Sequence, residues 1–217
     1  MFKSKAAAAA LMSLSLAGLS LAGCARNGDV LPSGVITSYS ACPPVAIVAP
    51  MGDITLFNPE NSRDAAAIDV VAHITNVRST CQEVGEQLVT TTNFVIQAQR
   101  RDPRGEREVV LPYFASVVQG GQNVIAKRVS RVGLRFPDGQ ARATTTGTAT
   151  SQVSRAAATL PDDIRRRITA ERRAGDQSAA VDPLSDPAVR AAVDRASFEM
   201  LIGFDLTQDQ LRYNATR

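Results

Sequence analysis

The sequence has 217 residues, of which 44% are hydrophobic and 21% are charged, so the chain can build the hydrophobic core of one domain, with room for an appended part. Its 24 basic and 21 acidic residues leave a formal net charge of +3 at pH 7. A charge balance this close to neutral gives no sign of the clustered basic surface that nucleic acid binding requires. We therefore expect no nucleic acid partner.

The first 23 residues have the pattern of a secretory signal peptide. Two lysines precede an apolar stretch over residues 6–22, which is too short and too rich in Ala, Gly and Ser for a transmembrane helix of about 20 strongly apolar residues. The motif L-A-G-C that ends this segment resembles a bacterial lipobox. The resemblance implies a diacylglycerol on the thiol of Cys24 and cleavage just before it. Ordinary cleavage after Ala25 is the alternative.

Cleavage before Cys24 would leave a chain attached to a membrane by its lipid. Residues 24–41 mix Gly, Pro, Ser and Asn with scattered apolar residues, which predicts a lipidated N-terminus and tether with a reach of about 20 to 25 Å. Ala25 follows the cysteine instead of an aspartate, which by the sorting habit of bacterial lipoproteins implies the periplasmic face of the outer membrane. Cleavage would remove two lysines and no acid, so the net charge would fall to +1.

Two further cysteines, Cys42 and Cys81, form an even pair once Cys24 carries lipid. An oxidising compartment favours a disulfide between them. Two free thiols are an alternative, and so is a metal pair, although no neighbouring His or Cys completes a zinc site.

Segments rich in β-branched and aromatic residues, bounded by turn residues, predict strands in the following order. They lie at residues 45–48, 54–57, 68–75 running towards Cys81, 87–100, 109–119, 123–136 and 141–154. Gly120-Gly121 predicts a hairpin connection. The imperfect alternation after it predicts a bulge near Gly133.

The pattern changes at residue 160, where acidic residues precede an arginine-rich helix and a loop leads to a second helix. Asp186 is the expected N-cap of that second helix, with Pro187 in its first turn. Residues 198–204 alternate again and predict the last strand, and Thr207 to Gln210 have the spacing of a capping box.

This order predicts a mainly β fold over residues 42–217, an antiparallel immunoglobulin-like or fibronectin III-like β-sandwich. The helical segment at residues 160–196 lies between two strands, so we expect a helical insertion before the last strand and no separate domain.

Two stretches, VLPYFASVVQGGQNVIAKRVSRVGLRF and ASFEMLIGFDLTQDQLRYN, resemble uncharacterised envelope lipoproteins of alphaproteobacteria. In that family an aromatic-rich strand hairpin and a terminal "GF-L-T-x-x-Q-L" segment recur. The resemblance covers most of the chain from Cys42 onward. It implies a β-sandwich and an envelope location, and it implies no activity.

Catalytic, cofactor and metal motifs are not found in the sequence. His73 is the single histidine, and Asp69, on the same strand face, lies about 13 Å away, too far for a direct hydrogen bond. The acidic pairs at residues 162–163 and at 83 and 86 suit a helix start and a solvated loop better than a glycosidase site. We therefore expect no catalytic residue, no cofactor and no metal site.

Arginines gather in two places. Arg100, Arg101, Arg104 and Arg107 crowd one turn, with acids beside them. The second group is the candidate contact with anionic headgroups or phosphates, and it consists of Arg165, Arg166, Arg167, Arg172 and Arg173. A solvated basic helix face is the alternative.

These observations favour a non-enzymatic, membrane-anchored periplasmic lipoprotein, a structural or accessory protein of an envelope complex. The alternative is a periplasmic binding module for a small or lipidic ligand. A basic pocket lined by Phe94, Tyr113 and Phe114 would favour the binding module, and a solid sandwich with an exposed apolar patch would favour the accessory protein.

Overall fold

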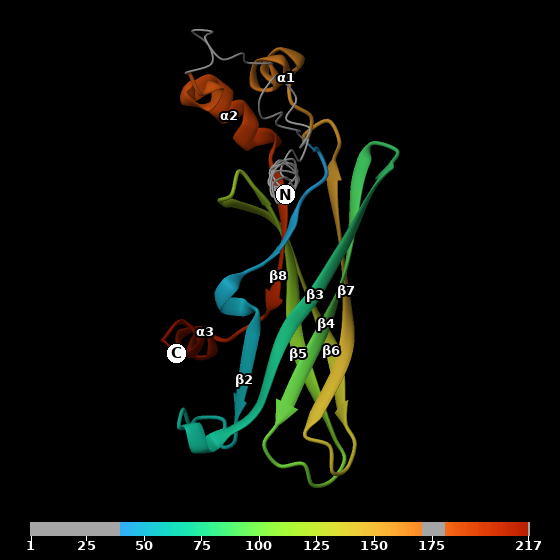
Figure 1. Ribbon diagram of the computed structural model, residues 1–217, viewed down its shortest axis with the longest axis vertical. Coiled ribbons are helices and arrows are strands. Elements are labelled where there is room, and N and C mark those ends of the chain that lie inside the picture. Colours follow the sequence, from blue (N-terminus) through green and yellow to red (C-terminus); the bar gives the residue numbers. More distant parts are fainter. Residues whose placement is uncertain (1–39, 171–180, 217) are drawn as a thin grey trace, which may run out of the picture. The chain divides into compact units, whose positions relative to one another are not determined.

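The computed structural model describes residues 40–170 and 181–216 (Figure 1). Its strands are β1 (Val45–Ile47), β2 (Asp53–Phe57), β3 (Ile68–Val84), β4 (Gln87–Arg100), β5 (Arg107–Gln119), β6 (Asn123–Phe136), β7 (Arg142–Ser154) and β8 (Phe198–Phe204). Its helices are α1 (Asp162–Thr169), α2 (Pro187–Ala196) and α3 (Gln208–Thr216), with short 3-10 turns η1 (Ala49–Met51), η2 (Ala65–Ala67) and η4 (Pro183–Ser185).

The strands form two four-stranded sheets that pack face to face. One sheet has the order β1-β8-β5-β6 and the other has the order β2-β3-β4-β7. Among the described strands, β1 and β8 pair in parallel and the other pairs are antiparallel. The predicted β-sandwich with helices before the last strand is therefore confirmed.

The core lies between the sheets because alternate residues of each long strand point inward. The inward residues of β4 have even numbers, and those of β7 have odd numbers. Most of them are buried. Phe94 packs edge to face against Tyr113 of the opposite sheet, with ring centroids 5.2 Å apart. A Cβ atom at Gly147 would overlap the Phe94 ring, so glycine at this position makes room for that ring in the core.

The hairpin predicted at Gly120-Gly121 joins β5 to β6, and both glycines have positive φ angles of 59° and 71°. The bulge predicted near Gly133 is wrong. Gly133 pairs regularly with Val110, and the register shift lies instead near the hairpin, where Ile125 has no partner on β5. A second hairpin turn, at Gly85 between β3 and β4, was not predicted.

Cys42 and Cys81 form a disulfide with a Cα–Cα distance of 6.1 Å, as predicted. It joins the segment before β1 to the far half of β3, where Cys81 pairs across the sheet with Thr90. The predicted lipid site Cys24 lies outside the described residues, and so do the predicted signal peptide and the predicted tether up to residue 39.

The helical insertion has a small apolar core of its own, and that core consists of Leu160, Ile164, Val189, Ala192 and Ala196. The side chain of Asp186 accepts a hydrogen bond of 2.8 Å from the amide of Ala188, which confirms the predicted N-cap of α2. The capping box before α3 is confirmed as well, because Thr207 and Gln210 each accept a hydrogen bond from the other's amide.

Candidate functional site

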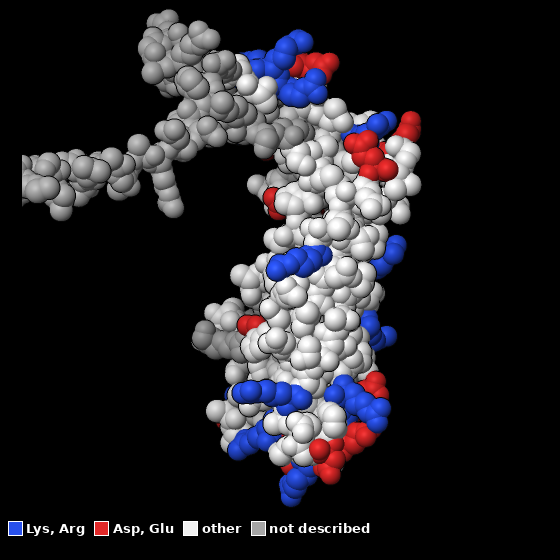
Figure 2. All heavy atoms as spheres, turned by 45° about the vertical axis from the view of Figure 1, so that its right-hand side comes forward, with Lys and Arg blue, Asp and Glu red and all other residues white. Residues whose placement is uncertain are grey.

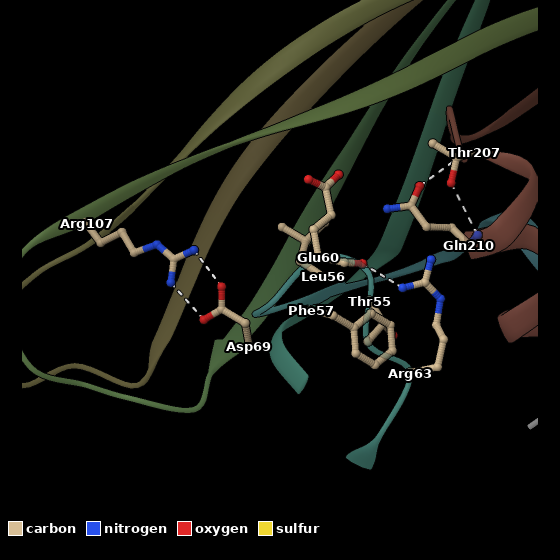
Figure 3. A pocket seen from close by; sticks show the side chains of 9 residues that line it. All are labelled: Thr55, Leu56, Phe57, Glu60, Arg63, Asp69, Arg107, Thr207 and Gln210. Atoms are coloured by element: carbon tan, nitrogen blue, oxygen red, sulfur yellow. Dashed lines mark hydrogen bonds and ion pairs between the residues drawn. The ribbon is translucent and has the colours of Figure 1, made fainter. Parts of the chain in front are cut away.

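A cavity of about 260 Å³ lies where β2, β3 and the start of β5 meet the residues before α3 (Figure 3). Its polar lining comes from distant parts of the chain. The lining residues are Thr55, Leu56, Phe57, Glu60, Arg63, Asp69, Arg107, Thr207 and Gln210.

Three of the four charged side chains of this cavity, Arg63, Asp69 and Arg107, are held by one another or by the backbone. Arg107 donates two hydrogen bonds to Asp69, of 2.8 and 2.6 Å, which raise the pKa of Arg107 above its usual value. Arg63 donates to the carbonyls of Glu60 and Ser62, and its guanidinium lies 5.1 Å from the centre of the Phe57 ring. These contacts hold the loop before β3 and the start of β5 against the sandwich. We therefore assign these three side chains to folding.

His73 lies on the outer face of its sheet, and its partner is a residue that the sequence did not suggest. Its Nδ1 atom is 2.5 Å from Oδ1 of Asp53, a residue that faces it on β2. The Asp69 carboxylate is instead bonded to Arg107. The shallow hollow around His73 has no Ser, Thr or Cys among its described lining residues, so the His–Asp pair has no neighbouring nucleophile there.

The arginines of the turn after β4 do not form an exposed basic group. Arg100 is buried, with 2% of its surface exposed, and it donates hydrogen bonds to four backbone carbonyls, so it cannot reach an anionic headgroup. Arg101 bonds the carbonyl of Ala66. Arg104 bonds Asp102 and holds the pKa of that carboxyl well below its usual range.

The arginines of α1 are partly neutralised by neighbouring acids. Arg165 is 2.6 Å from Asp162, and Arg167 is 2.7 Å from Asp186 of the α2 cap. Arg166 is exposed, while Arg172 and Arg173 lie outside the described residues. Figure 2 agrees, because on the face that it shows, positive side chains lie beside negative ones at both ends and stand singly between.

The three aromatic residues that would have lined a basic pocket do not meet in one. Phe94 and Tyr113 lie in the core, and the Tyr113 hydroxyl donates to the carbonyl of Thr148 at 2.8 Å. Phe114 points to the opposite face of β5, where the ammonium of Lys127 lies 4.9 Å from its ring centre.

The first half of β6 is the most exposed part of the sheets. Every residue from Asn123 to Val129 is exposed, and β6 is the edge strand of its sheet. Val124, Ile125 and Val129 expose 63, 51 and 49% of their surfaces. The whole strand carries four basic residues and no acid, and of these Arg128 and Arg131 have no acidic partner among the described residues. This exposed half of β6, residues 123–129, is called the β6 arm below.

Within residues 40–170 and 181–216, no three His, Cys, Asp or Glu side chains gather as a metal site would require. None of the helices in these ranges is long and apolar enough to cross a membrane. Comparison with protein-family models, with curated proteins and with solved structures found no match to this chain.

Sequence reasoning missed the Asp53–His73 pair and the burial of Arg100. For Asp53 no local signal exists, because the contact depends on how β2 pairs with β3. For Arg100 the signal was present: the inward positions of the strand that ends there are those of even number, so residue 100 continues the buried series.

Proposed function

We propose that this protein is a non-enzymatic, membrane-anchored lipoprotein on the periplasmic face of the outer membrane, where it serves as a structural or accessory protein of an envelope complex. The lipobox-like motif before Cys24 supports the anchor and the address. The disulfide between Cys42 and Cys81 supports an oxidising compartment.

The β6 arm is the observation that carries the proposal of a protein partner. Three branched apolar side chains, Val124, Ile125 and Val129, are about half exposed or more within six positions of one edge strand. An exposed apolar group on an edge strand is a liability unless a partner covers it. The net positive charge of β6 favours a partner with an acidic rim, because complementary charge speeds and orients docking.

Affinity capture from cross-linked envelopes tests the partner. Threonine at positions 124, 125 and 129 keeps the strand propensity and removes the apolar groups, so it should abolish recovery of a protein that the wild type captures. Val84→Thr is the matched control, since Val84 is 58% exposed at the end of β3, and it should leave capture unchanged. Equal capture by the triple variant would refute docking on the β6 arm.

Fractionation of cells tests the anchor separately. Cys24→Ser should move the protein out of the membrane fraction and remove the mass of the lipid. A variant that stays in the membrane with an unchanged mass would refute lipidation, whatever the capture experiment shows.

The alternative is a binding module for a small or lipidic ligand. The arrangement of three aromatic residues argues against a lipid as that ligand. Two of these residues, Phe94 and Tyr113, lie in the core, whereas Phe114 lies on the opposite face of β5. They therefore do not line one pocket that could hold a lipid chain.

A further inference from the structure

The outermost strands of the two sheets, β6 and β7, lie next to each other on one side of the sandwich. β6 is the last strand of one sheet and β7 the last strand of the other. Between them lies a cavity of about 270 Å³, lined by residues 126–128 of β6 and 150–152 of β7, with Ala115 and Val117 of β5 beside them. Neighbouring residues of a strand point to opposite faces, so a cavity lined by three in a row also meets the unpaired main-chain groups of each edge.

The inner wall of this cavity contains a hydroxyl group that the fold leaves without a partner. Ser151 is 7% exposed, and its Oγ atom accepts and donates no hydrogen bond within the described residues. Thr90, which faces Ser151 across β4 and β7, is 1% exposed, and its Oγ1 atom is unpartnered as well. Buried polar atoms almost always have a partner, so two adjacent exceptions require an explanation.

The cavity exists because the side chains that meet between the sheets at this position are small. Small side chains, among them Ala115, Ala126 and Ser151, line it where the long strands could carry Leu or Phe. The pair of hydroxyls also divides the buried apolar residues of the sheet interior into two clusters, one that includes Phe94 and one that includes Leu88. These two hydroxyls at this depth oppose the hydrophobic contribution to folding, and no hydrogen bond among the described residues offsets their burial.

A cation lies at the same cavity. Arg128 lines it, is exposed, and has no acidic partner among the described residues. Its neighbour Lys127 is different, because the Lys127 ammonium bonds Asp205 at 2.9 Å and lies over the Phe114 ring. The guanidinium of Arg128 is therefore free to bind an oxyanion at two points, as arginine does with carboxylates and phosphates.

We propose that the cavity between β6 and β7 binds the anionic oxygen group, a carboxylate or a phosphate, of a small molecule. Arg128 supplies the charge, and the Ser151 hydroxyl donates to the buried end of the ligand. A volume of about 270 Å³ is slightly below the range of typical ligand pockets, which limits the ligand to the size of a sugar phosphate or a small dicarboxylate. This site goes beyond the proposed docking of a protein and does not depend on it.

Titration calorimetry of the full chain in detergent tests the site with three probes: inorganic phosphate, citrate and glycerol 3-phosphate. At least one should bind saturably at millimolar concentration or below, whereas uncharged glycerol should not. Arg128→Gln should weaken that binding about tenfold or more, the expected effect of losing a charge-assisted pair. Arg131→Gln is the matched control, because it removes a cation from the same strand that does not line the cavity.

The role of the Ser151 hydroxyl is tested by measuring stability and ligand affinity in the same variant, because the proposal predicts that they change in opposite directions. Ser151→Ala removes a buried group without a partner, so the free protein should unfold at the same temperature as the wild type or higher, while the affinity for the bound probe falls several-fold. A Ser151→Ala protein that is less stable and binds as well as the wild type would show that the hydroxyls hold only water, and would overturn the proposal.

Two other outcomes would also overturn it. One is the absence of saturable binding by all three probes, and the other is equal weakening by the Arg128 and Arg131 variants, which would indicate general screening of charge. Native mass spectra of protein released from envelopes then distinguish the two ligand classes by mass, carboxylate or phosphate. Loss of partner capture in the β6 arm variants has no bearing on these results.

Discussion

Among single replacements of a polar residue, we expect replacement of Arg100 to lower the stability of this fold most. Its guanidinium donates to the carbonyls of Gln140, Gly105 and Pro137 at 2.8 to 2.9 Å and to that of Pro103, and it lies 5.2 Å from the ring centre of Phe136. The bonds hold the β4–β5 connection against the β6–β7 connection, two turns that share no strand pairing.

The magnitude follows from these four bonds. Hydrogen bonds to a charged group contribute about 1.5–3 kcal/mol each, and roughly half of that is recovered where water can reach the freed carbonyls of a turn. Arg100→Met keeps the length of the buried stem and loses all four bonds, so we expect it to lower the free energy of unfolding by about 3–6 kcal/mol. Arg100→Lys should lose about 2 kcal/mol, because an ammonium cannot reach four divergent carbonyls.

Urea unfolding followed by far-UV circular dichroism measures the effect, since the chain has no tryptophan to report by fluorescence. Arg104→Met is the matched control, because Arg104 lies in the same turn and bonds only the nearby Asp102 at the surface. It should leave the midpoint unchanged. An Arg100→Met midpoint equal to that of the wild type, or a loss as large in the Arg104 variant, would refute the reasoning.

Two further predictions concern the disulfide and the cap of α2. Replacing Cys42 and Cys81 by alanine opens a loop with a sequence separation of 39 residues, which should cost about 4 kcal/mol of stability. Thermal unfolding with and without reductant measures this loss. Identical unfolding curves of the wild type in the two conditions would contradict the prediction. Bonds from Arg167 and then from the amide of Ala188 lower the pKa of Asp186 below its ordinary 3.8. The carboxylate therefore stabilises the fold above that ordinary pKa, and its contribution disappears as the pH falls through the lowered value. Asp186→Asn should be less stable than the wild type at neutral pH and equally stable in strong acid, and a pH-independent difference between the two would be inconsistent with this origin.

Local patterns predicted most of the elements because their causes are local. The alternation of apolar residues in a strand, the two glycines of the β5–β6 turn and the acidic cap of α2 each act within a few positions of the chain. The disulfide joins residues 39 positions apart and was predicted for a different reason: two cysteines are left once Cys24 is set aside as the predicted lipid site. The bulge was misplaced because its position depends on how β5 and β6 twist against each other, which alternation in one strand does not determine.

The sequence by itself determined that the chain folds as a mainly β domain with a helical insertion, that Cys42 and Cys81 pair, and that Asp186 caps a helix. Only the tertiary structure decided the partners of the charged side chains. It brought four backbone carbonyls around Arg100 and placed Arg128 at a cavity between β6 and β7. The reason is physical: hydrogen bonds and ion pairs act over a few ångströms, and the residues that meet at that range here are brought together by strand register and sheet packing, from positions up to 40 residues apart for Arg100.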